Sequence, residues 1–193
     1  MGPSPSVSVC KQKHVHVKVN EVVAVCQRQC VKSVREMLEL CRITEALLIG
    51  NARSACCDEL IQKEGVTLCI NVSKQQPFPS MRVGTFRVPV YDDPNENLLK
   101  YFDRCADAIE SEAGRGGRTV VYCKNGRSRS AAVCMAYLMK HRALSLPQAF
   151  QMVKEARSVV DPNPGFRTQL EKYEQELERR RSKGEGMVAS SSC

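Results

Sequence analysis

The sequence predicts an α/β fold from about Ile43 onward, because short apolar runs there alternate with helical patterns. The run Val66–Val72 is continuously apolar enough for a strand buried in a parallel sheet. A second run, Thr119–Tyr122, leads into a loop of small and polar residues and then into a helical pattern over Ser130–Arg142. A chain of 193 residues is long enough for one domain with a sizeable core and short for two.

The other elements follow from apolar spacing and from residues that start or stop helices. A strand over Ala46–Ile49 ends at Gly50, and Ser54 is expected to cap a helix that runs to about Glu64. Pro89 suggests a sheet edge or a strand end. The further expected elements are a strand over Thr85–Val90 and helices over Asn97–Ser111, Ser145–Arg157 (opened by a capping box) and Pro164–Arg181.

These elements place one domain at residues 39–181. Residues 1–38 are expected to be an N-terminal extension, partly ordered or flexible, and residues 182–193 a disordered tail rich in Gly and Ser. His14 and His16 would share one strand face in the extension, but no third ligand accompanies them, so a solvated face is favoured over a metal site.

The composition limits where the protein can be located and what it can bind. No apolar run could span a membrane, no signal peptide opens the chain, and Pro3 argues against myristoylation at Gly2, so no stable membrane insertion is expected. Eleven cysteines without a disulfide pattern favour a reduced, intracellular setting. We expect the cytoplasm, with the nucleus left open; the oligomeric state is not indicated.

The net charge of +8 is concentrated in one stretch. Ala113–Lys154 contains eight Lys or Arg and no Asp or Glu, which would attract an anionic substrate. Nucleic acid is not an expected partner, because aromatic residues, on which bases could stack, are only 5% of the chain.

The segment Cys123-Lys-Asn-Gly-Arg-Ser-Arg129 carries the predicted chemistry. A strand, a loop and a helix N-terminus in succession form an anion site, and the positive end of the helix favours the thiolate of Cys123. Arg129 could grip two phosphate oxygens, and Ser130 places a hydroxyl beside the thiol. The sequence therefore predicts attack of the thiol on phosphorus, which forms a phosphocysteine intermediate.

Such a reaction also needs a proton donor for the departing oxygen. Asp92 and Asp93 follow the predicted strand that ends near Val90, so a loop could carry either carboxyl over the thiol. The run Asp-Asp-Pro-Asn is equally typical of an ordinary turn, and the residues alone do not choose between the two aspartates.

The run VYCKNGRSRSAAVCMAYLM resembles the dual-specificity protein phosphatases, and so do LLIGNARSA, LCINVS, PVYDD and PNPGFRTQLEKYE in the same order. The resemblance covers roughly residues 40 to 175. It implies a central, twisted, mostly parallel sheet flanked by helices. It also implies hydrolysis of phosphotyrosine and phosphoserine or phosphothreonine in protein substrates, without metal or cofactor.

By motif position, the resemblance assigns a role to several residues. It makes Cys123 the nucleophile, Arg129 the phosphate clamp and Ser130 the hydroxyl that eases thiolate departure. Asp92 becomes the general acid, with Asp93 as the alternative. Asn163 matches a residue that braces the loop. The expected phosphate-binding residues are Lys124, Asn125, Gly126, Arg127, Ser128 and Arg129.

Two features of the sequence point away from an ordinary member of this family. The family usually has His before the nucleophile, and here it is Tyr122, a phenol that is neutral at neutral pH because its ordinary pKa is about 10. We therefore expect a weak enzyme whose rate still rises above neutral pH, or alternatively a feeble phosphate-binding pseudophosphatase. Lys124 and Arg127 resemble the basic loop of tensin-homologue phosphoinositide phosphatases, so a phosphoinositide or other polyanionic substrate is a second alternative.

Overall fold

The computed structural model describes residues 39–189, with side chains to residue 183. The predictions for residues 1–38, including the pair His14 and His16, lie outside the described residues, and so do those for 190–193.

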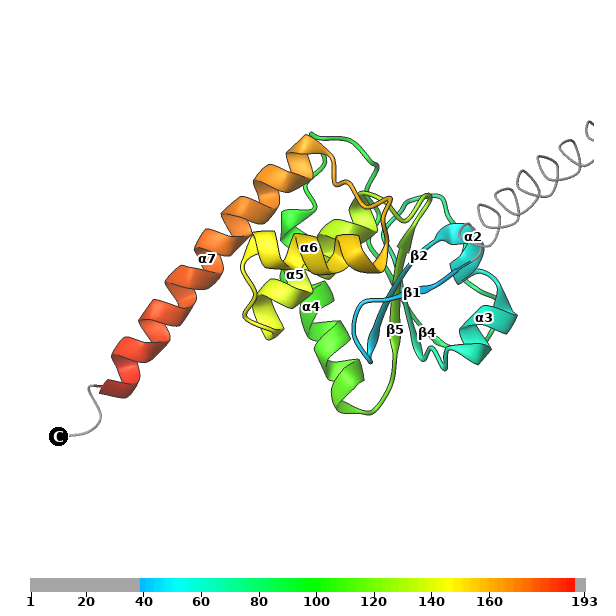
Figure 1. Cartoon of the computed structure of the whole chain (residues 1–193), viewed down its shortest axis with the longest axis horizontal. Helices are drawn as coiled ribbons and strands as arrows, with labels where there is room; N and C mark the ends of the chain where they lie inside the picture. The colour runs from blue at the N-terminus through cyan, green and yellow to red at the C-terminus, as the bar shows by residue number, and fades with distance from the viewer. Residues whose placement is uncertain (1–38, 190–193) are drawn as a thin grey trace, which may run out of the picture. The chain divides into compact units, whose positions relative to one another are not determined.

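The described residues contain one five-stranded sheet (Figure 1). Its spatial order is β1-β2-β5-β3-β4, with β1 antiparallel to β2 and every other pairing parallel. The strands are β1 (Cys41–Arg42), β2 (Leu47–Asn51), β3 (Leu68–Asn71), β4 (Gly84–Arg87) and β5 (Thr119–Cys123). The mostly parallel α/β fold is confirmed. β4 lies at the sheet edge and ends at Arg87, two residues before Pro89, so the strand predicted over Thr85–Val90 is shorter than expected.

Six helices accompany the sheet in the described part of the chain. They are α2 (Ala52–Ala55), α3 (Asp58–Lys63), α4 (Leu99–Gly114), α5 (Arg129–His141), α6 (Leu146–Ala156) and α7 (Pro164–Ala189). The capping box at Ser145 with Gln148 is confirmed at the start of α6.

Two helix boundaries differ from the predictions. Ser54 does not start a helix: it lies inside α2, where its N–H donates to the side chain of the N-cap Asn51 at 2.8 Å, and α3 starts separately after Cys57. Asn51 is as good an N-cap as serine, and it stands three residues earlier. At the other end, α7 continues past Arg181 to Ala189, so the tail boundary predicted at 182 lies within a helix.

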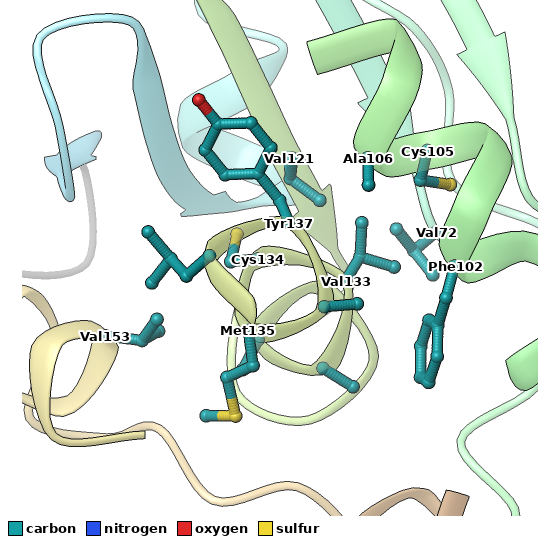
Figure 2. Packing of buried hydrophobic residues seen from close by; sticks show 14 of the residues in the cluster. Val72, Phe102, Cys105, Ala106, Val121, Val133, Cys134, Met135, Tyr137 and Val153 are labelled. Carbon is teal, nitrogen blue, oxygen red and sulfur yellow. The ribbon is translucent and has the colours of Figure 1, made fainter. Parts of the chain in front are cut away.

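The helices cover both faces of the sheet. Figure 1 shows α4, α5, α6 and α7 on one side of it and α2 and α3 on the other. Helix α5 is buried from Arg129 to Met139 because it lies between the sheet and the other helices of its face. In Figure 2, Val121 of the sheet and Phe102 of α4 pack near Val133 of α5.

The strand β5 lies in the middle of the sheet, and its residues alternate between the two faces. Val121 and Cys123 belong to the larger cluster, which includes α4 to α7. Val120 and Tyr122 belong to the smaller cluster on the α2 and α3 side. The carboxyl end of β5 therefore delivers Cys123 to the edge where open parallel sheets bind ligands.

Candidate active site

The loop from Cys123 to Arg129 joins the central strand β5 to helix α5. Gly126 turns this loop with a φ of 64°, a conformation that side chains with a Cβ rarely adopt. A Cβ at this position would also lie 2.5 Å from the carbonyl oxygen of Gly50, so the loop packs directly against the end of β2. This position therefore requires glycine on two grounds.

The carbonyl groups of this loop are held from outside by four hydrogen bonds. The N–H of Ala52 donates to Lys124 O at 3.4 Å, and the N–H of Asp161 donates to Arg127 O at 2.9 Å. Between them, the buried guanidinium of Arg157 donates to the carbonyl oxygens of residues 125 and 126, at 3.2 and 2.9 Å. Because C=O and N–H point in opposite directions across a trans peptide, the N–H groups face the inside of the loop.

Cys123 is buried at the start of this loop, and its Sγ lies 3.3 Å from Ser130 Oγ. Burial by itself would raise the pKa of the thiol. Hydrogen bonds from the Ser130 hydroxyl and N–H, the charge of Arg129 and the N–H of Arg127 outweigh burial, so the pKa of Cys123 lies below its ordinary value. The site therefore favours the thiolate, which is the reactive form of cysteine.

Arg129 is 8% exposed and lies in the first turn of α5. Its Nη1 donates to Val90 O at 3.1 Å, which ties the loop to the segment that follows β4. Its Nε has no hydrogen-bond partner among the described residues. A buried guanidinium donor without a partner is unfavourable, so the site favours an acceptor from a bound anion.

Asp92 contacts the loop, whereas Asp93 does not. Asp92 Oδ1 accepts hydrogen bonds from Ser128 Oγ at 2.6 Å and from Asn163 Nδ2 at 2.9 Å. Asp93 Oδ1 instead accepts from the N–H and side chain of Asn95, within its own turn. Of the two aspartates that the residues alone left open, the structure brings only Asp92 to the loop.

Asn163 joins three elements at this point. Its N–H donates to Ser128 Oγ at 3.1 Å, and its Oδ1 accepts from the N–H of Phe166 in the first turn of α7. Gly165 lets that first turn approach Pro94, because a Cβ there would collide with the proline carbonyl. The arrangement fixes α7, the loop and the Asp92 segment relative to one another.

Tyr122 lies on the face of β5 opposite to Cys123. Its side chain is fully buried, and its hydroxyl donates to Pro77 O at 2.7 Å. Burial raises the pKa of this phenol well above the ordinary value expected from sequence, and the nearby thiols of Cys56 and Cys69 raise it further. Tyr122 is neutral and gives the thiol no positive charge.

Lys124, Asn125 and Arg127 are exposed at the rim of the loop. Beside the rim is a hollow of about 460 Å³. Its lining residues are Asp92, Asn125, Arg127, Ser128, Asp161, Pro162, Asn163, Pro164 and Arg167.

Sequence reasoning missed two residues of this region. Arg157, which holds two loop carbonyls, carries no recognisable signal, because it ends an amphipathic helix that could end in any polar residue. Asp161 stands in the run Asp-Pro-Asn-Pro, which is typical of a turn, yet its carboxylate bonds to both Arg127 and Arg167. Among residues 39–183, no group of three or more His, Cys, Asp or Glu side chains is placed to hold a metal ion. Within the part of the chain that the structure describes, none of the helices combines the length and the apolar character that spanning a bilayer requires.

Comparison with known proteins places this fold and loop in a family. Residues 47–176 match the family model described as dual specificity phosphatase, catalytic domain. Human dual specificity phosphatase 28 is 56% identical over 140 residues, which cover 72% of this chain and 80% of the relative. A crystal structure of human DUSP28 with a tyrosine-to-histidine substitution matches with a TM-score of 0.72 and 54% identity, over 73% of this chain and 97% of that one.

A more distant neighbour is the human tyrosine phosphatase-like serine/threonine/tyrosine-interacting protein. Its crystal structure matches with a TM-score of 0.67 and 30% identity, over 72% of this chain and 97% of that chain. The family match spans β2 to α7 and includes the whole loop from Cys123 to Arg129. The chain therefore belongs to the dual specificity phosphatase family and carries that family's catalytic domain.

Proposed function

We propose that this protein hydrolyses phosphotyrosine and phosphoserine or phosphothreonine in protein substrates through a phosphocysteine intermediate. The observation that carries the proposal is the environment of the Cys123 sulfur. Cys123 has a lowered pKa, and it opens a loop whose N–H groups face inward beside the buried Arg129. A nucleophilic thiolate beside an anion-binding site is the arrangement that phosphoryl transfer requires.

In the first step, the Cys123 thiolate attacks phosphorus in line with the leaving oxygen. A sulfur–phosphorus bond forms, the phosphorus–oxygen bond breaks, and the electron pair of that bond goes to the leaving oxygen. Asp92, which the loop contacts through Ser128, donates the proton that this oxygen needs. The loop N–H groups and Arg129 stabilise the charge on the transferred phosphoryl oxygens.

In the second step, water attacks phosphorus and the sulfur–phosphorus bond breaks. Asp92, now a carboxylate, takes the proton from the water and returns to its acid form. The Ser130 hydroxyl, 3.3 Å from Sγ, donates to the sulfur as it leaves with the electron pair. The products are inorganic phosphate and the free enzyme.

We further propose that turnover is weak near neutral pH because Tyr122 replaces the usual histidine. Burial works against the thiolate, and the opposing contributions come from Ser130, Arg129 and the loop amides. A neutral tyrosine on the other face of β5 adds nothing to them. For each unit by which the pKa of Cys123 would be lower with a charged neighbour, the thiolate is about 1.4 kcal/mol less stable without that neighbour.

The test is the rate of para-nitrophenyl phosphate hydrolysis from pH 5 to 9, measured on the protein and on Cys123→Ser. We expect a measurable rate that rises with pH through neutrality and disappears in the variant. Acid quenching during turnover should trap a phosphate label on Cys123. Equal and negligible rates in both proteins would contradict the proposal.

That contradictory outcome would support a second candidate function, a phosphate-binding protein without turnover. The observation that favours it is the similarity to a human protein named as tyrosine phosphatase-like and as an interacting protein. The buried thiol and the Asp92 contact with the loop favour the enzyme instead. Binding of a phosphotyrosine peptide without release of phosphate would identify the binder.

A further inference from the structure

The hollow beside the Cys123–Arg129 loop contains two arginines and two aspartates. Arg127 Nη2 lies 2.5 Å from one carboxylate oxygen of Asp161, and Arg167 Nη2 contacts the other. The formal charges of the lining residues sum to zero with Asp92 ionised, and to +1 with Asp92 protonated as in the first step proposed above. In both cases Asp161 cancels one of the two positive charges that the arginines bring to the hollow.

Asp161 is held in place between the two arginines. Its N–H donates to Arg127 O at 2.9 Å, and the carbonyl of the next residue, Pro162, accepts from Arg167 Nε at 2.9 Å. Hydrogen bonds from Arg127 and then Arg167 lower the pKa of Asp161, so its carboxyl is ionised near neutral pH. Both ends of the Asp161 segment are thus fixed by backbone contacts to the same arginines that its side chain binds.

We propose that Asp161 determines substrate specificity: it occupies Arg127 and Arg167 and so makes the protein favour protein segments with one phosphate over segments with a second phosphate nearby. This inference rests on the proposed function, because the first phosphate is taken to bind in the Cys123–Arg129 loop. It names the substrate class, a singly phosphorylated protein segment, and it opposes a phosphoinositide or other polyanionic substrate.

The physical reason is competition for the same donors. A second phosphate that entered the hollow would have to displace the Asp161 carboxylate, or lie beside it and be repelled. Without that negative charge, the two guanidinium groups could bind a phosphate through several charge-assisted hydrogen bonds. The loop position next to the nucleophile, Lys124, does not line the hollow and does not replace them.

The test compares two synthetic peptides that differ only in a second phosphate two residues from the phosphotyrosine. Their affinities are measured on the inert Cys123→Ser protein, with and without Asp161→Asn, so that the result does not depend on turnover. We expect Asp161→Asn to shift the affinity ratio toward the doubly phosphorylated peptide by about fivefold. Adding Arg167→Gln to Asp161→Asn should remove most of that gain.

A charge-matched control separates a local effect from a change in net charge. Asp107→Asn removes one carboxylate from α4, where it pairs with Lys140 and His141, and it should leave the ratio unchanged. Asp161→Ser removes the same charge with a smaller side chain and replaces the asparagine variant if that variant does not fold. An unchanged ratio in both Asp161 variants, or an equal shift in Asp107→Asn, would overturn the inference.

Two further outcomes are distinguishable. Tighter binding of a soluble inositol bisphosphate than of the singly phosphorylated peptide, before any change at Asp161, would overturn the inference in favour of a polyanionic substrate. If the wild-type protein shows no turnover but Asp161→Asn still shifts the ratio of the two peptide affinities, the proposed hydrolysis would be refuted and the specificity role of Asp161 would be supported.

Discussion

Tyr122 and Cys123 are neighbours in the chain, but they lie in different chemical surroundings. Both are fully or almost fully buried, on opposite faces of β5. The pKa of Tyr122 is raised by burial, whereas the pKa of Cys123 is lowered in spite of burial. The difference lies in which contributions prevail: the Ser130 hydroxyl, backbone N–H groups and Arg129 outweigh burial at Cys123. At Tyr122, burial and two thiols outweigh the side chain of Asn71 and the charge of Arg87. Position relative to the loop, rather than proximity in sequence, decides reactivity.

Asp92 and Asp93 are a second pair of neighbours in the chain. Substituting each of them is the strongest test of the conclusion that position relative to the loop decides reactivity. Asp92→Asn should lower kcat by about 100- to 1,000-fold, because the leaving oxygen loses its proton donor. Asp93→Asn should change kcat less than threefold, since its carboxylate serves only its own turn. Steady-state rates across pH on an aryl phosphate with a poor leaving group measure both. Similar losses in the two variants would remove Asp92 from its proposed role.

Gly126→Ala tests whether the backbone of the loop produces the low pKa of Cys123. The added methyl would meet the carbonyl of Gly50, in a backbone conformation that alanine disfavours. We expect kcat/KM to fall by about 50-fold and the pH dependence of thiol alkylation to move upward. The matched control is Gly114→Ala at the end of α4, where nothing lies within 4 Å. Retention of activity in Gly126→Ala would show that side chains alone tune the sulfur.

Arg157→Gln tests the support of the loop from outside. It removes a buried cation that donates to two loop carbonyls, so unfolding should become about 2–4 kcal/mol easier in urea. Inhibition by vanadate should weaken about tenfold, because the inward N–H groups lose their alignment. Arg157→Lys keeps the charge but cannot reproduce both hydrogen bonds, and we expect it to rescue less than half of the lost affinity. Full rescue by lysine would mean that charge, and not geometry, is what Arg157 contributes.

Tyr122→His should change activity least, and in the opposite direction. Histidine has an ordinary pKa of about 6.5, so near and below neutral pH it adds positive charge beside the loop and favours the Cys123 thiolate. We expect kcat/KM at pH 6.5 to rise by about fivefold, with the two proteins converging at higher pH as the thiolate forms in both. Tyr122→Phe, which only loses the hydrogen bond to Pro77, should leave this part of the profile in place. An equal gain in the phenylalanine variant would trace the weak activity to that hydrogen bond instead.

The local parts of the fold and the site could be predicted from the sequence. The strand before Cys123, the glycine within the loop and the helix after it are consecutive in the chain, so apolar runs and residue types identify them directly. The two-residue strand β1 could not be identified, because it has no pattern of its own and exists only by pairing with β2. The helix expected after Ser54 was also wrong, since Asn51 is an equally good cap and the segment divides into two short helices.

The distant contacts of the site could not be predicted. The choice between Asp92 and Asp93 depends on Ser128, which is 36 positions away and reaches only one of them. Arg157 acts on carbonyl groups, which every residue possesses, so no spacing of side chains reveals its role. The low net charge of the hollow depends on Asp161 meeting two arginines in space, whereas the sequence shows a long basic stretch.

Asn163 has a consequence for how this protein can vary. One amide side chain caps α7 through its oxygen and restrains Asp92 through its nitrogen. Substituting that residue would therefore fray the beginning of a helix and free a carboxylate in the same event, so mutational tolerance there is set by two requirements at once. Selection for a steadier C-terminal helix and selection for a well-positioned proton donor would act on the same codon.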